Sequence, residues 1–247
     1  MEKPHISIII PTLNEESHIP LLLTSLSTQT ERSFEVIISD AHSTDETRNI
    51  ASSFREKLPS LTVVEHNAKT VGSARNKGAE QATGTYLLFL DADVQIENIF
   101  LQSILDISKD KQKDMLTVWN HPSKPSFKGS VVFLLLNLTM AIFQHIKPAA
   151  NGGCIYIAKL YFDKVKGFDP DIIFGEDFDL VQRAWKAGAR FAVYKEPKLL
   201  VSPRRFEKEG LIKSFYKSLK AIVYQLFLGP IKKPIFSYEM GGQYYKK

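Results

Sequence analysis

The chain has 247 residues, 44% hydrophobic and 24% charged, ordinary values for a soluble globular protein with one large α/β domain or a domain and an appendage. Its single cysteine, Cys154, excludes an internal disulfide, and no apolar stretch of signal-peptide length follows Met1–His5, so we expect a reducing, cytoplasmic compartment. The formal net charge of +5 comes from the tail, because residues 203–247 carry 10 Lys and Arg against 3 Asp and Glu, whereas the remainder carries 22 against 24.

Residues 1–120 alternate strand and helix signals along the chain. Short apolar runs bounded by polar residues predict buried strands, and they lie at residues 6–10, 34–38, 61–64 and 86–90. Helical patterns lie between them, at residues 17–27, 45–58 and 73–81. Strands that alternate with helices form βαβ units around a parallel sheet. The sequence therefore predicts an α/β fold, with a Rossmann-like and mostly parallel sheet flanked by helices.

Polar residues follow the first two predicted strands at their carboxyl ends, which is where open α/β sheets bind ligands. The loop from Pro11 through Thr12 and Asn14 to Glu15 follows the first strand, and its backbone and the Glu15 carboxylate are suited to hold a nucleoside. Asp40 ends the second strand. Because a carboxylate only accepts hydrogen bonds, Asp40 suits the ring N–H of uracil, thymine or guanine better than adenine. A turn at the first loop and a capping role for Asp40 are the alternatives.

The predicted strand at residues 86–90 ends abruptly in Asp91-Ala92-Asp93. Two carboxylates one residue apart on a bending backbone can share Mg²⁺ or Mn²⁺, which in turn accepts phosphate oxygens. We expect Asp93 to bind the metal directly and Asp91 to reach a ribose or the metal's water shell. Arg75 opens the helix before this strand, where a helix N-terminus and a guanidinium suit a base or a pyrophosphate. These residues predict a metal-assisted site for a phosphate-bearing substrate.

Two apolar segments of the second half raise the question of a membrane. The apolar run at residues 131–143 is too short to span a bilayer even when it is extended through Ile146 as a helix, which leaves a buried helix or an interfacial segment. Residues 211–227 place apolar side chains on one helical stripe with lysines grouped beside it. A basic amphipathic helix of this kind lies in a bilayer interface or packs on its own domain. We expect contact with an anionic membrane surface, with packing on the domain as the alternative.

Two charged pairs lie further along the second half. Glu176-Asp177 precedes a helix expected over residues 178–187, and acidic residues at a helix N-terminus also interact favourably with the helix dipole. Arg204-Arg205 follows the last strand-like run, residues 198–201. Two adjacent arginines can clamp a pyrophosphate or an acceptor phosphate. Both pairs are therefore candidates for a site that handles phosphate.

Four motifs in this order resemble the family 2 glycosyltransferases of the GT-A fold, and they lie at residues 8–16, 39–45, 91–93 and 174–180. The resemblance runs from His5 to Arg205, so we expect a GT-A domain over residues 1–205 and a basic amphipathic extension over residues 206–247. It implies a metal-dependent, inverting transfer of a sugar from a nucleoside-diphosphate sugar, UDP- or GDP-linked, to a hydroxyl or phosphate. The acceptor, which the sequence does not identify, is a glycan, a lipid, a protein or a small molecule.

The resemblance also implies residue roles. Asp177 would be the general base that takes the proton from the acceptor hydroxyl, and Asp40 would recognise the nucleotide base. Gln95 occupies a position that related polyprenyl-phosphate sugar transferases use near the metal. Some relatives place a metal-binding His near Arg205, but here no His follows it, which is a departure from the pattern. The residues expected to bind the nucleotide sugar are Pro11, Thr12, Asn14, Glu15, Asp40, Arg75, Asp91, Glu176, Arg204 and Arg205.

Three other classes of protein share parts of this pattern. A haloacid-dehalogenase-like phosphohydrolase also carries Asp-x-Asp after a strand, with the first Asp as nucleophile. However, three strand signals precede the motif here, and Asp40 and Glu176-Asp177 would have no role. A catalytically silent nucleotide-sugar-binding scaffold would keep the same fold. A nucleic-acid module would explain the basic tail, but the tail has an apolar stripe rather than a groove-reading motif, so we expect no nucleic-acid partner.

Overall fold

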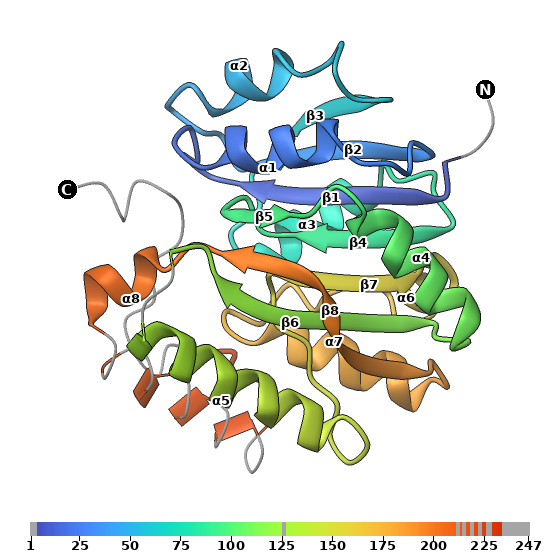
Figure 1. The fold of residues 1–247 in the computed structure, drawn as a ribbon, viewed down its shortest axis with the longest axis vertical. Coiled ribbons are helices and arrows are strands. Elements are labelled where there is room, and N and C mark those ends of the chain that lie inside the picture. Colours follow the sequence, from blue (N-terminus) through green and yellow to red (C-terminus); the bar gives the residue numbers. More distant parts are fainter. Residues whose placement is uncertain are drawn as a thin grey trace.

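The described residues of the computed structural model, 4–124, 127–210, 213, 216–217, 220–221, 224–225 and 229–233, form an eight-stranded sheet flanked by helices (Figure 1). The strands lie in the order β3-β2-β1-β4-β7-β6-β8-β5. Their bounds are β1 Ile6–Thr12, β2 Phe34–Asp40, β3 Leu61–Glu65, β4 Tyr86–Leu90, β5 Val94–Ile96, β6 Met115–Pro122, β7 Cys154–Ala158 and β8 Phe191–Val201.

The sheet combines a parallel part with a mixed part. β3, β2, β1 and β4 pair in parallel, which confirms the predicted α/β class. β7 runs antiparallel between β4 and β6. β8 pairs in parallel with β6 and antiparallel with the short β5. The antiparallel pairings involve strands that follow β4, where the chain has no regular alternation of strand and helix signals.

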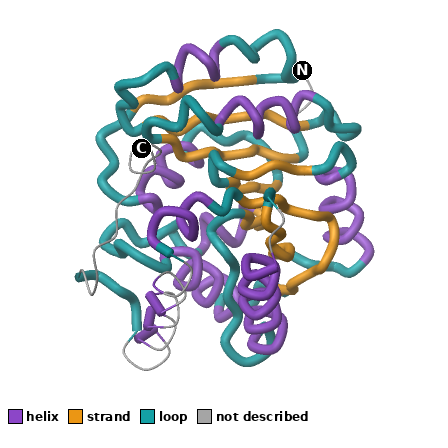
Figure 2. Tube along the Cα trace, turned by 60° about the vertical axis from the view of Figure 1, so that its left-hand side comes forward, coloured by secondary structure: helices purple, strands orange, loops and turns teal. Residues whose placement is uncertain are grey.

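Helices cover both faces of the sheet, as both views show (Figures 1 and 2). One buried cluster joins one face of the sheet to α1, α2 and α4, and a second cluster joins the other face to α3, α6 and α7. The helix bounds are α1 Ile19–Ser27, α2 Thr47–Ser52, α3 Val71–Ala79, α4 Phe100–Asp110, α5 Phe127–Phe143, α6 Lys159–Lys164, α7 Glu176–Lys186 and α8 Arg204–Glu209.

The apolar strand sequences follow from this layering. Successive side chains of a strand point to opposite faces, so Ile8 and Ile10 of β1 enter one cluster while Ile9 enters the other. All three are completely buried. A strand buried on both faces reads as a continuous apolar run, which is why β1 and β4 are predicted correctly from sequence.

Several helices differ from the predicted ranges. The helix predicted over residues 17–27 begins at Ile19, because Pro20 occupies the first turn, where its missing N–H costs no hydrogen bond. The helix predicted over residues 45–58 ends at Ser52 and continues as turns. The helix predicted over residues 178–187 begins two residues earlier, at Glu176, because Gly175 takes the cap position with a positive φ of 75°.

The helix α5 packs only in part against the sheet. Val132, Phe133 and Met140 are buried, and α5 contacts β6 and β8. Other large apolar side chains remain exposed, among them Phe127 at 86% and Ile142 at 65%. No helix of the described residues is long and apolar enough to cross a membrane. Most of the helix predicted over residues 211–227 lies outside the described residues.

Candidate active site at the carboxyl edge of the sheet

Residues from separate predicted motifs meet at one edge of the sheet. Thr12 at the end of β1 pairs in register with Asp40 at the end of β2. Asp91 directly follows β4, which is the parallel neighbour of β1 on the other side. The carboxyl ends of parallel strands form the ligand-binding edge of open α/β sheets. The structure therefore brings the first, second and third motifs to one edge, as the strand assignments predict.

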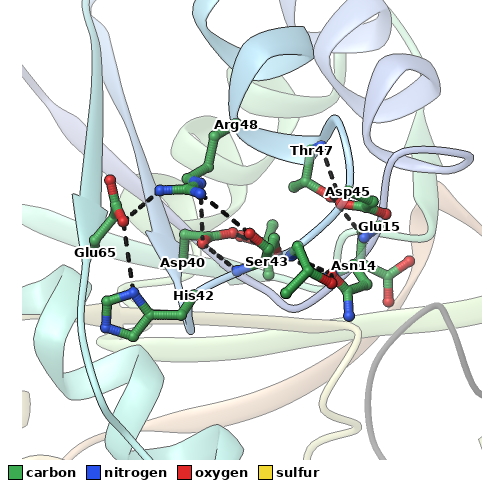
Figure 3. A network of polar contacts seen from close by, with 11 residues as sticks. Asn14, Glu15, Asp40, His42, Ser43, Asp45, Thr47, Arg48 and Glu65 are labelled. Carbon is green, nitrogen blue, oxygen red and sulfur yellow. Dashed lines mark hydrogen bonds and ion pairs between the residues drawn. The ribbon is translucent and has the colours of Figure 1, made fainter.

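Asp40 is completely buried and organises the loop that follows β2 (Figure 3). Its carboxylate accepts hydrogen bonds from the Thr12 hydroxyl at 2.9 Å, from the Ser43 hydroxyl at 2.6 Å and from the Ser43 N–H at 2.8 Å. Arg48 lies beside it, with Nε 3.8 Å from Asp40 Oδ1. These contacts correspond to the capping alternative, and contact between Asp40 and a nucleotide base stays a prediction.

The loop after β1 is tied to the loop after β2 (Figure 3). Asn14 has a positive φ of 54°, a conformation that Asn tolerates. Its N–H donates to Ser43 Oγ at 2.9 Å, and its side-chain oxygen accepts from the Thr44 N–H at 2.7 Å. The Glu15 N–H donates to Thr47 Oγ1 at 2.8 Å. Asn14 therefore holds the two loops together, while Pro11 and Thr12 are the last residues of β1.

A charged rim beside Asp40 was not predicted from the sequence. It consists of Arg48, Glu65 and His42, whose side chains are 38%, 47% and 53% exposed. Arg48 forms an ion pair with Glu65, and Nδ1 of His42 lies 3.5 Å from an oxygen of the same carboxylate (Figure 3). Each residue belongs to an ordinary polar stretch. Only the pairing of β2 with β3 brings Glu65 beside the loop after β2.

Arg75 is the centre of the second half of the site. Its side chain is 1% exposed, and it donates to Glu176 Oε1 at 2.7 Å, to Asp91 Oδ1 at 2.8 Å and to the Gly152 carbonyl at 2.9 Å. The guanidinium also lies over the Phe168 ring, 5.4 Å from its centroid. A buried guanidinium is stable only where its charge is paired. Arg75 thus joins the third and fourth motifs, and it is a structural bridge in this state.

Asp177 lies in the first turn of α7, next to Glu176. Burial and the negative charge of Glu176 raise the pKa of Asp177 to about 8, with Arg75 opposing the shift. The Phe178 N–H donates to Asp177 Oδ1 at 2.9 Å. Burial, together with the charge of Asp93, also raises the pKa of Asp91, again against Arg75. Perturbed carboxylates gathered in one place are characteristic of catalytic sites.

Gly152 was not singled out from the sequence and lies between these carboxylates. A Cβ at Gly152 would be 3.5 Å from Asp177 Oδ2, 3.8 Å from Asp91 Oδ2 and 3.1 Å from Arg75 Nη2. The backbone before β7 therefore passes close to three charged groups, and a Cβ at this point would crowd the Arg75 guanidinium while it met the two carboxylates at van der Waals distance. The pair Gly152-Gly153 ahead of a strand is the signal that identifies this position, because glycine near a strand marks close backbone approach.

Arg204 connects the end of β8 to the loop after β1. It donates to both oxygens of Glu15, at 2.7 and 2.9 Å, and its Nε lies 2.9 Å from Asp93 Oδ2. Burial alone would raise the pKa of Glu15, but hydrogen bonds from His18 and Arg204 outweigh it and hold the pKa below its usual value. The structure thus brings Arg204 to the site, whereas the side chain of Arg205 lies outside the described part.

The carboxylates after β4 fit a divalent cation that the protein would share with a phosphate. Asp91 and Asp93 offer the oxygen ligands that Mg²⁺ and Mn²⁺ prefer, and Mg²⁺ commonly takes one or two carboxylates and completes its shell with phosphates and water. Within the described residues, no three His, Cys, Asp or Glu side chains are grouped to hold a metal by themselves. Gln95 lies in β5 and pairs with Leu200, and its contact with a metal stays a prediction.

Comparison with known sequences gives matches along the chain. A model of the family described as "Glycosyl transferase family 2" matches residues 7–156, more than half of the chain. A PGL/p-HBAD biosynthesis glycosyltransferase of Mycobacterium bovis (strain BCG / Pasteur 1173P2) is 44% identical over 94 residues, 38% of this chain and 37% of that protein. Putative glycosyltransferase EpsH of Bacillus subtilis (strain 168) is 25% identical over 240 residues, 97% of this chain and 62% of EpsH. The chain spans less than two thirds of either relative.

Two solved structures have a similar fold. Staphylococcus aureus TarS 1-349 in complex with UDP-GlcNAc superimposes with a TM-score of 0.64 at 22% identity, over 80% of this chain and 58% of that chain. The mannosyltransferase PcManGT from Pyrobaculum calidifontis, in complex with GDP-Man and Mn²⁺, superimposes with a TM-score of 0.69 at 20% identity, over 89% of this chain and 65% of that chain. At these identities the likeness lies in the fold.

Proposed function

The chain belongs to glycosyl transferase family 2 and has the GT-A fold, and from this premise we propose that it transfers a sugar from a nucleoside-diphosphate sugar to an acceptor hydroxyl or phosphate. The reaction is a single displacement with inversion. The acceptor oxygen bonds to the anomeric carbon as the bond to the nucleoside diphosphate breaks, and the proton of an acceptor hydroxyl passes to Asp177.

The observation that carries the proposal is the convergence of Asp177 and Asp91 on Gly152. A Cβ there would be 3.5 Å from one carboxylate and 3.8 Å from the other. An acceptor oxygen near Asp177 would therefore be close to the anomeric carbon of a donor whose phosphate lies near Asp91, and such proximity supplies much of the rate in transfer reactions. A general base works best when its pKa lies near the working pH, which the raised pKa of Asp177 supports.

The donor would occupy the carboxyl edge of β1, β2 and β4. We propose that Asp40 and the loop from Pro11 to Glu15 bind the nucleoside, while Arg204, with Arg205 beside it in the sequence, binds the diphosphate. UDP and GDP are the nucleotides of choice, because the TarS and PcManGT structures hold UDP-GlcNAc and GDP-Man, and both bases offer an N–H edge to a carboxylate.

A divalent cation, Mg²⁺ or Mn²⁺, is part of the proposal. Asp93 would hold it, with Asp91 and Gln95 nearby, and PcManGT is solved with Mn²⁺. When bound, such a cation offsets the negative charge that develops on the departing diphosphate. Arg75 keeps Asp91 oriented through its 2.8 Å hydrogen bond, so the protein fixes one of the carboxylates before the donor arrives.

We propose that the acceptor is presented at an anionic membrane surface on the cytoplasmic side. Several large apolar side chains of α5 and of the following turn are exposed, with Ile142 at 65% and Ile146 at 73%. Gln225 of the tail lies beside the turn after α5, because Lys147 Nζ donates to its carbonyl at 3.1 Å. Apolar side chains flanked by lysines favour an anionic bilayer interface, and the buried free thiol of Cys154 suits a reducing compartment.

Sedimentation with phosphatidylglycerol vesicles tests the membrane contact. The double variant Ile142→Gln, Ile146→Gln should lower the bound fraction several-fold, and phosphatidylcholine vesicles should bind less wild-type protein than phosphatidylglycerol vesicles. Failure of the wild-type protein to bind phosphatidylglycerol vesicles would end this part of the proposal.

A thermal-shift panel tests the donor assignment first. UDP-, GDP-, dTDP- and ADP-sugars are compared with and without Mn²⁺, since a ligand of the folded state raises the melting temperature. We expect a metal-dependent shift with UDP-GlcNAc or GDP-mannose that Asp93→Ala removes and that Asp110→Ala, an exposed control at the end of α4, leaves intact. Release of nucleoside diphosphate then separates an enzyme from a silent binding scaffold, which would bind the donor without turnover.

A further inference from the structure

The last described residues of the chain lie against the loop that leads into α7. Ala221 and Ile231 are each 1% exposed and Gln225 is 8% exposed. The Ile173 N–H donates to the Ile231 carbonyl at 3.1 Å, next to an antiparallel bridge between Phe174 and Ile231. This part of the tail is thus paired with the domain over residues 173–174.

Polar contacts fix the tail at two further points. Lys232 Nζ lies 2.7 Å from Asp169 Oδ2, at the start of the same loop. Gln225 Nε2 donates to the Phe174 carbonyl at 3.2 Å and approaches the Gly175 carbonyl at 3.5 Å. The backbone of Gln225 is itself held, since its carbonyl accepts from Lys147 Nζ. The backbone of Gln225 is therefore held separately from the contact that its side-chain amide makes with the loop.

Gly175 is the residue through which this contact reaches the site. It caps α7 with a φ of 75°, and a Cβ on it would overlap the Gln225 amide. The next two residues are Glu176, which accepts from Arg75, and Asp177, which lies beside Gly152. Glu176 and Asp177 are the first two residues of α7, and a first helical turn depends on contacts at its cap because it has few hydrogen bonds of its own. A loosened cap would therefore leave both carboxylates without a fixed position.

We propose that Gln225 is a positioning residue for transfer, which holds the Phe174–Gly175 carbonyls so that α7 begins at Glu176 and presents Asp177 to the acceptor. The inference rests on the proposed function only for the role of Asp177. The tail is then a structural part of the transfer site, whatever contact its remaining residues make with a membrane.

The variant Gln225→Met tests this role, because it keeps the length of the side chain and removes the N–H donor. A cavity of about 380 Å³ lies beside the contact, with Lys147, Gly175 and Pro230 among its lining residues, so the substitution meets no overpacking. Gln225→Glu keeps the shape and turns a donor toward the two carbonyls into an acceptor. Lys213→Ala, at an exposed position of the same tail, is the matched control.

Hydrogen exchange of the peptide covering residues 173–180 is the first readout. We expect about tenfold faster exchange in both Gln225 variants and wild-type exchange in Lys213→Ala, because loss of the cap contact frees the first turn. The second readout is nucleoside diphosphate release from UDP-GlcNAc and GDP-mannose with Mn²⁺. The rate should fall about tenfold or more while the dissociation constant of the donor changes less than about threefold, because the base and not the donor site is misplaced.

Unchanged exchange and unchanged turnover in Gln225→Met would overturn the inference, and so would equal losses of rate and donor affinity. If Gln225→Met melts below the assay temperature, Gln225→Glu decides by the same readouts. The outcome is separable from the proposed function: wild-type turnover in Asp177→Asn would remove Asp177 as base, whereas the exchange of residues 173–180 reports on the cap contact regardless of chemistry.

Discussion

Replacing Asp177 by Asn should stabilise the protein while it abolishes transfer, and the stabilisation should grow with pH. The pKa of Asp177 is raised to about 8, so the folded state favours the neutral carboxyl and loses stability as the pH rises from the unfolded pKa toward the folded one. Asn is neutral throughout, and its Oδ1 can still accept the Phe178 N–H that Asp177 accepts at 2.9 Å. The substitution therefore removes the cost of the charge and keeps the capping contact.

The size of the effect follows from the pKa values. Each pH unit between about 4 and about 8 costs the wild type up to about 1.4 kcal/mol of unfolding free energy. Between about pH 5 and about pH 7 this amounts to about 3 kcal/mol, and we expect about half of it because the Asp177 side chain keeps some contact with solvent. A domain of this size changes its melting temperature by roughly 2–4 °C per kcal/mol. The advantage of the variant should thus grow by roughly 3–6 °C over that interval.

Thermal unfolding of wild type and Asp177→Asn at both pH values measures this difference. Asp179→Asn is the matched control, because it lies two residues on in the same helix turn and pairs with Arg183 at 2.6 Å, so it should lose rather than gain stability. Nucleoside diphosphate release is measured in parallel, and loss of a general base lowers the rate by about 10²–10⁴-fold. A melting-temperature difference that is constant with pH would refute the reasoning about burial, and near-normal turnover would remove Asp177 as base.

Three further substitutions probe other parts of the site. Gly152→Ala should slow nucleoside diphosphate release about tenfold or more at nearly unchanged donor affinity, because the methyl would lie 3.1 Å from Arg75 Nη2 and 3.5 Å from Asp177 Oδ2; a rate within about twofold of wild type would contradict it. Arg204→Met should lower the free energy of unfolding in urea by about 1.5–3 kcal/mol, because the buried Glu15 carboxylate loses both hydrogen bonds from Arg204 and keeps His18 as a partner, and calorimetry should find weaker UDP or GDP binding. Asp40→Asn should lower the free energy of unfolding by about 1–3 kcal/mol in the same assay, because Ser43 donates to both oxygens of Asp40 and the Asn amide offers a single oxygen. An unchanged midpoint would show that the loop does not depend on Asp40.

The parts of the fold that were predicted correctly are those coded by neighbouring residues. The strands β1, β2 and β4 are mostly buried, so their apolar runs predict both the strands and the polar residues at their carboxyl ends. Asp40 at the end of β2 and Asp91 after β4 could be assigned to one edge of the sheet for this reason. The bounds of α2 were less accurate, because the turn that follows its six residues is just as polar as the helix itself.

The contacts that complete the site were beyond prediction because they join residues far apart in the chain. Arg204 and Glu15 are 189 residues apart, and Arg75 and Glu176 are 101 apart. Nothing in the local pattern of either partner specifies the other, since a lone Arg or Glu is ordinarily solvated. Gln225 has the same property: its role depends on the absence of a side chain at Gly175, 50 residues earlier.

The charge balance of the site supports metal dependence independently of any relative. Among the side chains that the structure describes, two guanidiniums, of Arg75 and Arg204, face five carboxylates, those of Glu15, Asp91, Asp93, Glu176 and Asp177. Even with Asp177 protonated, the carboxylates of this described set outnumber its guanidiniums by two, and a nucleoside diphosphate adds further negative charge. Bringing such a donor to this edge without a cation would place like charges together in a partly buried site, where the repulsion is poorly screened. Donor affinity should therefore fall steeply when the cation is removed, and should recover in part when Asp93, which Arg204 contacts at 2.9 Å, is made neutral by Asp93→Asn.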